Sequence, residues 1–563
     1  MKQLRLILIF SFIWLTLAAC TTPTDATQTA TAVPNTPPPL PTPTLAPVTT
    51  ETEAPATATV EPAATAVSTQ PTSAPDTNNL LTLVQADIPA NAFDGLDVLA
   101  LNLPAGQEPL WAVYSVGFHN FDLDPWPSHF VALYTWRNDS WQEVARQLLN
   151  VNEQGEMAFG PDYLYEQGVT QVELADDDPQ NIWLAIDGGV GAHGGTFQLL
   201  RFDGTAFHLE INTSNSSPGV GYLEDLNGDG SQEVIIYLHD YYVFCYACGV
   251  RYLQFGVYTW DAVNQRLLEV SLQPMLMGQQ GHPARQPTNR AVELANADLW
   301  PQALIQIEEA ERLAAESDEP TDTYTLNWDA ALIRLYNQAY QAELQHAPYP
   351  LLTHIFYGDF AAALDIMRGY GNEQIFSATS PLIQGTMAEG NEPWLADYLL
   401  RQSSAALAVP NLDPATLAAA YYFHAWGSYL QNPADAEITA DLQQAATLVP
   451  TEPLYIQVTL PTVQRIQFAP GAISATVQGD VAAHVSDDYI LSAAAGQTMT
   501  VVIESPNSNV LLTIVGADGI PLTNGLMSGA TSWTGELPAT QDYIVRAIGT
   551  LEPAAYTLTV TIE

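Results

Sequence analysis

Apolar and polar side chains alternate strictly at the end of the chain. Tyr556, Leu558, Val560 and Ile562 are separated from one another by single threonines. In a β-strand this period of two places the apolar side chains on a buried face and the threonines on a solvated face. Together with turn signals at residues 496–497 and 518–519, the alternation predicts an antiparallel β-sandwich over residues 460–563.

Apolar positions recur at spacings of three and four, many of them as alanines, between residues 287 and 449. This period is typical of amphipathic helices. The segments that show it are 291–297, 303–315, 325–343, 360–368, 393–407 and 414–430. The pattern predicts an α-helical repeat domain over residues 284–452.

Residues 357–364, with three consecutive alanines at 361–363, resemble a tetratricopeptide repeat, in which small side chains allow paired helices to pack closely. The resemblance implies a TPR-like array whose concave face takes a peptide or protein segment. Because no uniform repeat length runs through the domain, an irregular helical solenoid is the alternative.

Short β-rich runs containing Trp, Tyr and Phe, separated by Gly, Asn and Asp, predict a β-rich domain over residues 78–275, with strands from about Leu80. Three units in it look related. Each begins with a polar-to-apolar step, at residues 107–111, 180–184 and 232–236, and continues into an aromatic hairpin. This spacing is typical of propeller-like blades. Since roughly four to eight blades normally close a propeller, a partial propeller and an irregular sandwich both stay open.

The N-terminus has the layout of a secretory signal, because Lys2 and Arg5 precede an apolar run that is too short to span a bilayer. The run ends in small residues directly before Cys20, which resembles the lipobox of bacterial lipoproteins. The resemblance implies a signal peptide over residues 1–19 and a diacylglyceryl thioether on Cys20 that holds the mature protein at a lipid membrane. An ordinary secretory signal with a chance cysteine is the alternative.

Residues 20–77 have the composition of a disordered stalk. Between residues 21 and 76 there are 17 Thr and 12 Pro and hardly any large apolar side chains, so this segment cannot bury a core. The sequence therefore predicts an extracytoplasmic protein of the cell envelope, anchored by lipid and held away from the membrane surface.

Charge narrows the possible partners further. The chain has 62 acidic residues against 15 Lys and Arg, for a formal net charge of −47, which excludes nucleic acid as a partner. Lys2 is the only lysine, and it lies in the predicted leader. The mature protein therefore lacks the lysine of a nucleotide-binding P-loop or of a Schiff base.

One loop carries a cation-binding pattern. Asp225, Asn227 and Asp229 place oxygen side chains at loop positions 1, 3 and 5, Ser231 offers its carbonyl at position 7, and Glu233 stands at position 9. The pattern resembles the DxNxDG loop of FG-GAP repeats, and the resemblance implies a structural Ca²⁺ ion held by these five residues. The alternative is a plain Asn-Gly and Asp-Gly turn.

Cys245 and Cys248 are the only cysteines besides Cys20. Since zinc requires four ligands and no second pair is present, a local disulfide in a hairpin turn is the favoured interpretation for an exported protein. A free pair and a redox or metal role are the alternatives.

Residues 465–563 resemble the bacterial pre-peptidase C-terminal domain, on the strength of the runs 467–471, 488–493, 496–498 and 537–543. The resemblance implies an accessory β-sandwich of secreted proteins. No peptidase module is recognisable upstream of it.

The sequence indicates no catalytic residues, because it contains no HExxH motif, no GxSxG motif and no glycine-rich phosphate loop. His193, the pair at residues 239–240, and the aromatics Trp126, Tyr237, Tyr241 and Tyr242 are candidates for a pocket, although core or loop positions explain each of them as well. The sequence therefore favours a non-catalytic surface lipoprotein that binds a peptide, protein or glycan. A secreted hydrolase of polysaccharide or protein and a structural envelope component are the alternatives.

Overall fold

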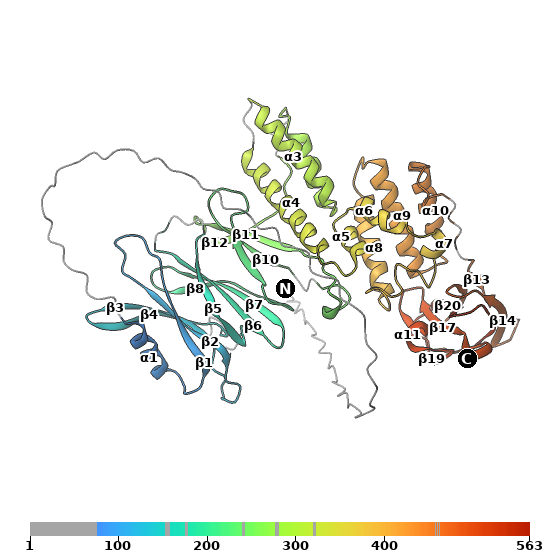
Figure 1. The fold of residues 1–563 in the computed structure, drawn as a ribbon, viewed down its shortest axis with the longest axis horizontal. Coiled ribbons are helices and arrows are strands. Elements are labelled where there is room, and N and C mark those ends of the chain that lie inside the picture. The colour runs from blue at the N-terminus through green and yellow to red at the C-terminus, as the bar shows by residue number, and fades with distance from the viewer. Residues whose placement is uncertain are drawn as a thin grey trace, which may run out of the picture. The chain divides into compact units, whose positions relative to one another are not determined.

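The structure is a computed structural model, and it describes residues 76–151, 158–174, 178, 180–238, 242–275, 281–318, 322–456, 458, 460 and 462–563 (Figure 1). The predicted signal peptide, Cys20 and nearly all of the predicted stalk lie outside these residues. The described chain is multidomain and combines β-rich and helical parts, as the sequence predicts.

Twelve strands form three antiparallel meanders of four strands each. The first meander contains β1 (Phe93–Ala100), β2 (Trp111–His119), β3 (Phe130–Arg137) and β4 (Ser140–Leu148). The second contains β5 (Tyr163–Val172), β6 (Ile182–Val190), β7 (Gly194–Phe202) and β8 (Phe207–Asn215). The third contains β9 (Gly221–Glu224), β10 (Glu233–Tyr237), β11 (Phe255–Asp261) and β12 (Arg266–Val270). Each of the three related sequence units supplies the last three strands of one meander, and a short pairing of β2 with β5 joins the first two meanders into one sheet.

The meanders stack through their side chains. Tyr114 and Leu133 of the first meander share a buried cluster with Leu184 of the second. Trp183, one residue further back on β6, belongs to a second cluster with Trp260 of the third meander. Because successive side chains of a strand point to opposite faces, β6 is buried on both faces. This explains why the strand is a nearly continuous apolar run and does not alternate.

A helix covers each outer face of the stack. Helix α1 (Thr77–Asp87) packs Leu80 and Val84 against Val113 of the first meander. Helix α4 (Thr323–Leu344) covers the third meander in the same way, with Trp328 and Leu332 against Ile235 and Val257. The stack is therefore sealed at both ends by helices.

The prediction of strands from Leu80 was wrong, because residues 77–87 form α1. The side chain of Asp76 accepts a hydrogen bond from the backbone N–H of Asn78 and caps the helix. The buried residues Leu80 and Val84 lie four apart, which is the spacing of a helix that packs along one face.

Among the described residues between 281 and 456, nine α-helices follow one another in chain order, and each of the six predicted helical segments overlaps one of them. They are α2 (Arg285–Ala295), α3 (Trp300–Glu316), α4, α5 (Pro350–Phe356), α6 (Phe360–Met367), α7 (Asn372–Ile375), α8 (Glu392–Leu407), α9 (Pro414–Gln431) and α10 (Ala436–Leu448). The pairs α2 with α3, α8 with α9, and α9 with α10 lie side by side. Small residues permit this packing: a Cβ on Gly427 of α9 would come within 3.0 Å of the side chain of Leu400.

The connection from β10 to β11 leaves the β stack and enters the helical core. Val250 and Leu253 are buried in that core, and the ring of Tyr252 stacks on Phe356 at 4.7 Å. The guanidinium of Arg251 donates two hydrogen bonds to the carboxylate of Glu343, at 2.6 and 2.9 Å. The sequence predicts that the helical domain begins after residues 275–284. In the structure, a segment that precedes this boundary already packs in the helical core.

Two sheets that share one core form the C-terminal part. One sheet contains β13 (Gln464–Arg465), β15 (Ser486–Ala493), β17 (Val510–Gly516), β18 (Pro521–Thr523) and β20 (Gln541–Gly549), and the other contains β14 (Ser474–Val481), β16 (Thr498–Glu504), β19 (Ser532–Glu536) and β21 (Ala554–Ile562). Tyr556, Leu558 and Val560 of β21 are buried in the shared core, as their alternation predicts. The pairing is not wholly antiparallel, because β13 runs parallel to β15.

Candidate functional site

The loops that follow β2, β6 and β10 meet at one end of the meander stack. The backbone N–H of Gly191, after β6, donates to the side chain of Asp162 at 2.7 Å, while the backbone N–H of His119, at the end of β2, donates to the Asp162 carbonyl at 3.2 Å. The ring of His193, also after β6, stacks on Tyr246 after β10, with centroids 4.5 Å apart. We call this part of the β region the loop end.

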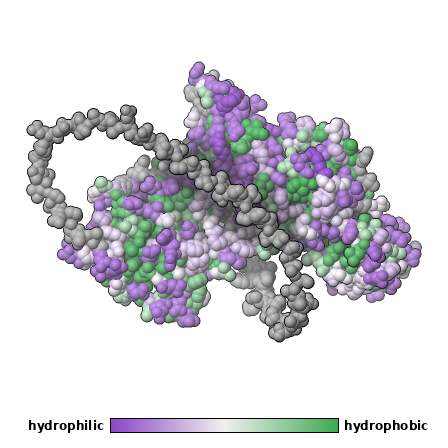
Figure 2. Space-filling model, in the orientation of Figure 1, coloured by the Kyte–Doolittle hydropathy of each residue, from purple (hydrophilic) through white to green (hydrophobic). Residues whose placement is uncertain are grey.

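Exposed aromatic rings concentrate in the first meander at the loop end. Phe118, Phe121 and Trp126 are 49%, 48% and 50% exposed. Phe121 and Trp126 meet edge to face, with centroids 5.6 Å apart. We refer to Phe121 and Trp126 together as the aromatic pair. Figure 2 shows hydrophilic and hydrophobic residues interspersed over the visible face of the protein.

His119 lies beneath the aromatic pair. Its ring centroid is 4.3 Å from that of Phe121 and 5.8 Å from that of Trp126. The side chain is only 5% exposed, and both ring nitrogens lack a hydrogen-bond partner within the described chain. Burial lowers the pKa of His119, which keeps the imidazole neutral. A neutral imidazole offers one donor and one acceptor to a ligand.

A buried Ser–His pair adjoins His119. The Nδ1 atom of His129 is 2.8 Å from Ser115 Oγ, and its Nε2 atom is 3.1 Å from the backbone oxygen of Asp162. Burial lowers the pKa of His129 to about 4. Both side chains are fully buried, so a substrate cannot reach the hydroxyl. This pair serves the fold, since a nucleophile must be accessible to its substrate.

Tyr163 extends the aromatic surface into the second meander. Its ring lies 4.9 Å from Phe118, and its hydroxyl donates to the hydroxyl of Tyr165 at 2.9 Å. The ring rests directly on Gly189, where a Cβ would come within 2.0 Å of Tyr163 Cε1. The glycine-rich hairpin between β6 and β7 thus makes room for an aromatic ring.

Only some of the residues at the loop end were predicted from the sequence. Trp126 and His193 lie at the loop end, whereas Tyr237 is half-buried and packs against Phe255, with ring centroids 5.3 Å apart. Residues 239–241 lie outside the described chain. The residues missed were Phe118, His119 and Phe121. The signal that could have found them is the aromatic density of residues 118–121 immediately after an apolar strand.

The predicted cation loop connects β9 to β10. Asp225 Oδ1 accepts hydrogen bonds from the backbone N–H groups of Gly228 and Asp229, and Asp225 Oδ2 accepts one from Gly230. The backbone N–H of Ser231 donates to Asp229 Oδ1 at 2.8 Å. The loop is therefore held by its own carboxylates.

Glu233 closes this loop from the first residue of β10. It is 1% exposed, and its carboxylate accepts a hydrogen bond from the backbone N–H of Leu226 at 2.9 Å. Burial, with a smaller contribution from Asp229 and Asp225, raises the pKa of Glu233 to about 7. A cation beside these three acids would remove that electrostatic cost, so the donor set fits a hard cation. In the described ranges, however, no group of three or more His, Cys, Asp or Glu side chains is arranged to hold a metal ion.

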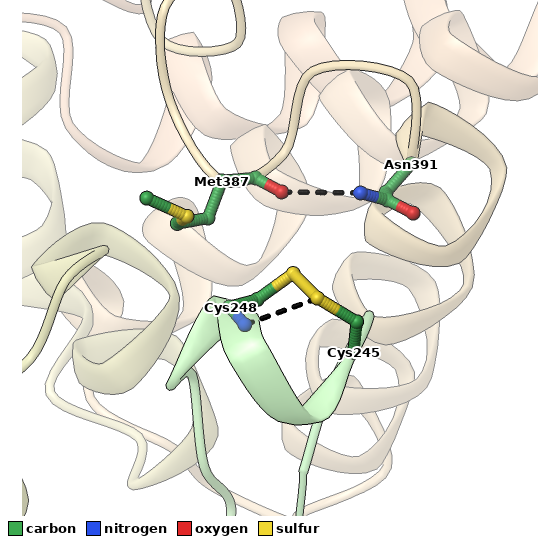
Figure 3. The surroundings of a disulfide bond; sticks show 4 residues. All are labelled: Cys245, Cys248, Met387 and Asn391. Atoms are coloured by element: carbon green, nitrogen blue, oxygen red, sulfur yellow. Dashed lines mark hydrogen bonds between the residues drawn. A yellow bond between two sulfur atoms is a disulfide. The ribbon is translucent and has the colours of Figure 1, made fainter. Parts of the chain in front are cut away.

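Cys245 and Cys248 form a disulfide, with their Cα atoms 5.1 Å apart. The bridge closes a single turn of 3₁₀ helix, η1 (Tyr246–Cys248), in the excursion between β10 and β11. Figure 3 draws it beside Met387 and Asn391, and Cys248 is half-buried against the helical core. The bridge therefore fixes a turn that is docked on the helices.

Comparisons with known proteins leave the family open. No family model and no curated protein matches the chain. Among solved structures, PliG of Aeromonas hydrophila, a periplasmic inhibitor of g-type lysozyme, is 29% identical over 18% of this chain and 96% of its own, with a TM-score of 0.17. PliG of Salmonella Typhimurium is 20% identical over 18% and 97%, with a TM-score of 0.15. TM-scores this low support no conclusion about fold or function. Within the described residues, no helix has the length and hydrophobicity needed to cross a bilayer.

Proposed function

We propose that the protein is a non-catalytic binding protein of the cell envelope, and that the loop end of its β region binds a glycan. The observation that carries the proposal is the aromatic pair, half-exposed over a buried imidazole whose two nitrogens have no partner in the described chain. Aromatic faces take the C–H groups of a sugar ring, while the exposed carboxylates of Asp122 and Asp124 hydrogen-bond hydroxyl groups. The enclosed imidazole of His119 joins them when Phe121 or Trp126 moves aside. A peptide is the competing ligand class.

Binding to soluble oligosaccharides, measured by calorimetry with the full-length protein, tests this proposal. We expect Trp126→Ala to weaken binding at least tenfold, because it removes one ring of the aromatic pair. The matched control is Trp394→Ala on α8, since Trp394 is 55% exposed but belongs to the helical part. Equal binding by wild type and Trp126→Ala would exclude the loop end, and saturable binding of a peptide in its place would change the ligand class.

We also propose export and lipid anchoring through Cys20, supported by the leader and by the Thr/Pro-rich composition that follows it. Growth with a labelled fatty acid should label the wild-type protein and leave Cys20→Ser unlabelled. An unlabelled wild-type protein with its leader intact in the cytosol would remove the anchor.

The modular resemblances support the same function. The three stacked four-stranded meanders favour an open, propeller-like β region, the paired helices favour a TPR-like array, and the two C-terminal sheets favour an accessory sandwich similar to pre-peptidase C-terminal domains. Each of these modules is typically used for binding.

We further propose that the loop at 225–233 binds Ca²⁺ in a structural role. Calcium would neutralise the three acids of the loop and hold β9 to β10, so a chelator should lower the melting temperature of the wild-type protein by several degrees. Asp225→Ala should melt at the lower temperature and no longer respond to EGTA. If neither the chelator nor the substitution changes the melting temperature, the loop is a plain turn.

A further inference from the structure

A small cavity of about 180 Å³ lies where β12 meets the start of α4. Its lining includes Asp329 and Trp328 of α4, Tyr324 near the mouth, and Glu269 of β12. Asp329 is 1% exposed, and Tyr324 is 70% exposed. The lining of the cavity therefore combines a buried carboxylate with two aromatic side chains.

One oxygen of the buried carboxylate has no partner. Asp329 Oδ1 accepts a hydrogen bond from the backbone N–H of Gln273 at 2.9 Å, whereas Oδ2 has none within the described chain. The charged neighbour that acts on Asp329 is another acid, Asp322. A buried carboxylate oxygen without a donor costs free energy, and a cationic hydrogen-bond donor is the group that relieves this cost most effectively.

We propose that this cavity binds a primary alkylammonium group, the chemistry shared by a free aliphatic amine and the side chain of lysine. The ammonium would donate to Asp329 Oδ2, and its methylene stem would lie along Trp328 and the apolar side chains of β12. Aromatic rings and an overall charge of −47 both favour a cation at this place. Lys2 is the only lysine of the chain and lies in the leader, so the occupant comes from another molecule.

The test uses the full-length protein and two pairs of probes at fixed ionic strength and at pH 8, where Asp329, whose pKa burial raises to about 7, is ionised. The pair n-butylammonium and n-butanol tests the charge. A blocked Gly-Lys-Gly peptide and its norleucine analogue test whether a lysine side chain enters the cavity from a polypeptide. We expect binding of the charged member of at least one pair and a minimum tenfold preference over its neutral analogue.

Asp329→Asn should weaken ammonium binding at least tenfold while keeping the shape of the side chain. Asp318→Asn is the control, since it removes the same charge from an exposed position and should change binding less than twofold. Tyr324→Ala, at an exposed side chain, should weaken binding two- to fivefold without affecting folding. Equal binding of charged and neutral probes, no binding of any probe, or binding unchanged in Asp329→Asn would overturn the proposal.

Discussion

At the scale of single residues, the buried carboxyl groups are the most informative feature of this acidic chain. Burial raises the pKa of Glu233 and of Asp329 to about 7, and that of Asp187 and Asp298 to about 6. The count of 62 acids predicts that nucleic acid is not a partner, but it cannot show which carboxylates are taken out of water. Only the tertiary packing selects these four.

These raised pKa values predict that the calcium-free protein is more stable near pH 5 than near pH 8. In the unfolded chain such groups lose their protons near pH 4, whereas Glu233 and Asp329 in the folded chain hold theirs to about pH 7. Because the folded state binds more protons on these carboxyl groups between these values, its unfolding free energy falls as the pH rises from about 4 to 7 and then levels off. The buried His129, whose pKa is lowered to about 4, opposes a part of this fall below about pH 6.5, but it is one group against four carboxyl groups.

Urea unfolding in EGTA at several pH values measures this fall. Asp329→Asn should reduce the fall in unfolding free energy between pH 5 and pH 8 by about 3 kcal/mol, since it removes one group whose pKa is raised by burial. Asp318→Asn should leave the fall unchanged. A stability that rises steadily from pH 5 to pH 8 would contradict the prediction.

At the residue scale the candidate site was only partly predictable. Trp126 could be predicted as a candidate binding residue because a tryptophan is unusual in a polar loop. His119 could not, since its value as a ligand group depends on burial beneath Phe121 and Trp126 and on the absence of a partner among the described residues. Both properties arise from packing.

At the scale of elements, the hydrophobic period correctly predicted helix or strand wherever the element buries one of its faces. Strand β21 follows its period of two, and the six helices that overlap the predicted segments follow periods of three to four. Within the described residues five α-helices were missed. They are α1, where strands were expected, the short helices α5, α7 and α11 (Gly525–Ser528), and α10, whose buried apolar positions were not singled out.

Helix α1 makes a testable contribution at this scale, because it seals the outer face of the first meander. Leu80 is fully buried there, while Leu83 of the same helix is 42% exposed. Leu80→Ala should lower the unfolding free energy of the β region by about 3 kcal/mol, because it leaves a cavity against β2 and β3. Leu83→Ala should cost less than about 0.5 kcal/mol.

Urea unfolding followed by tryptophan fluorescence compares the two variants. Since both substitutions remove the same atoms from the same helix, helix propensity cancels between them. Equal stability of Leu80→Ala and Leu83→Ala would show that α1 does not cover the meander in solution.

At the scale of the whole molecule, the excursion between β10 and β11 ties the β stack to the helices. Arg251 and Glu343 join segments 92 residues apart in sequence, and the side chain of Glu343 is 7% exposed. The disulfide turn lies in the same excursion. We therefore expect these two parts to support each other's stability.

Glu343→Gln should lower the unfolding free energy by about 2 kcal/mol, because it leaves the half-exposed Arg251 without its carboxylate. The control is Glu309→Gln, which breaks an ion pair with Arg312 whose members are 44% and 51% exposed and should change the unfolding free energy far less than Glu343→Gln does. Urea unfolding measures both variants. No difference between them would mean that the excursion does not hold the two parts together.

The sequence by itself determined the class of each region, because hydrophobic period and turn chemistry are local properties of the chain. It also determined the predictions for Cys20, for the loop at 225–233 and for the cysteine pair, since each depends on residue types at fixed spacing. Tertiary structure alone decided that the meanders stack face to face, that helices seal both ends of the stack, and that residues 243–253 pack among the helices. These features depend on contacts between segments far apart in sequence. His119 and Asp329 become buried only once those contacts have formed, and only then do the two ring nitrogens and Asp329 Oδ2 lie without a partner among the described residues.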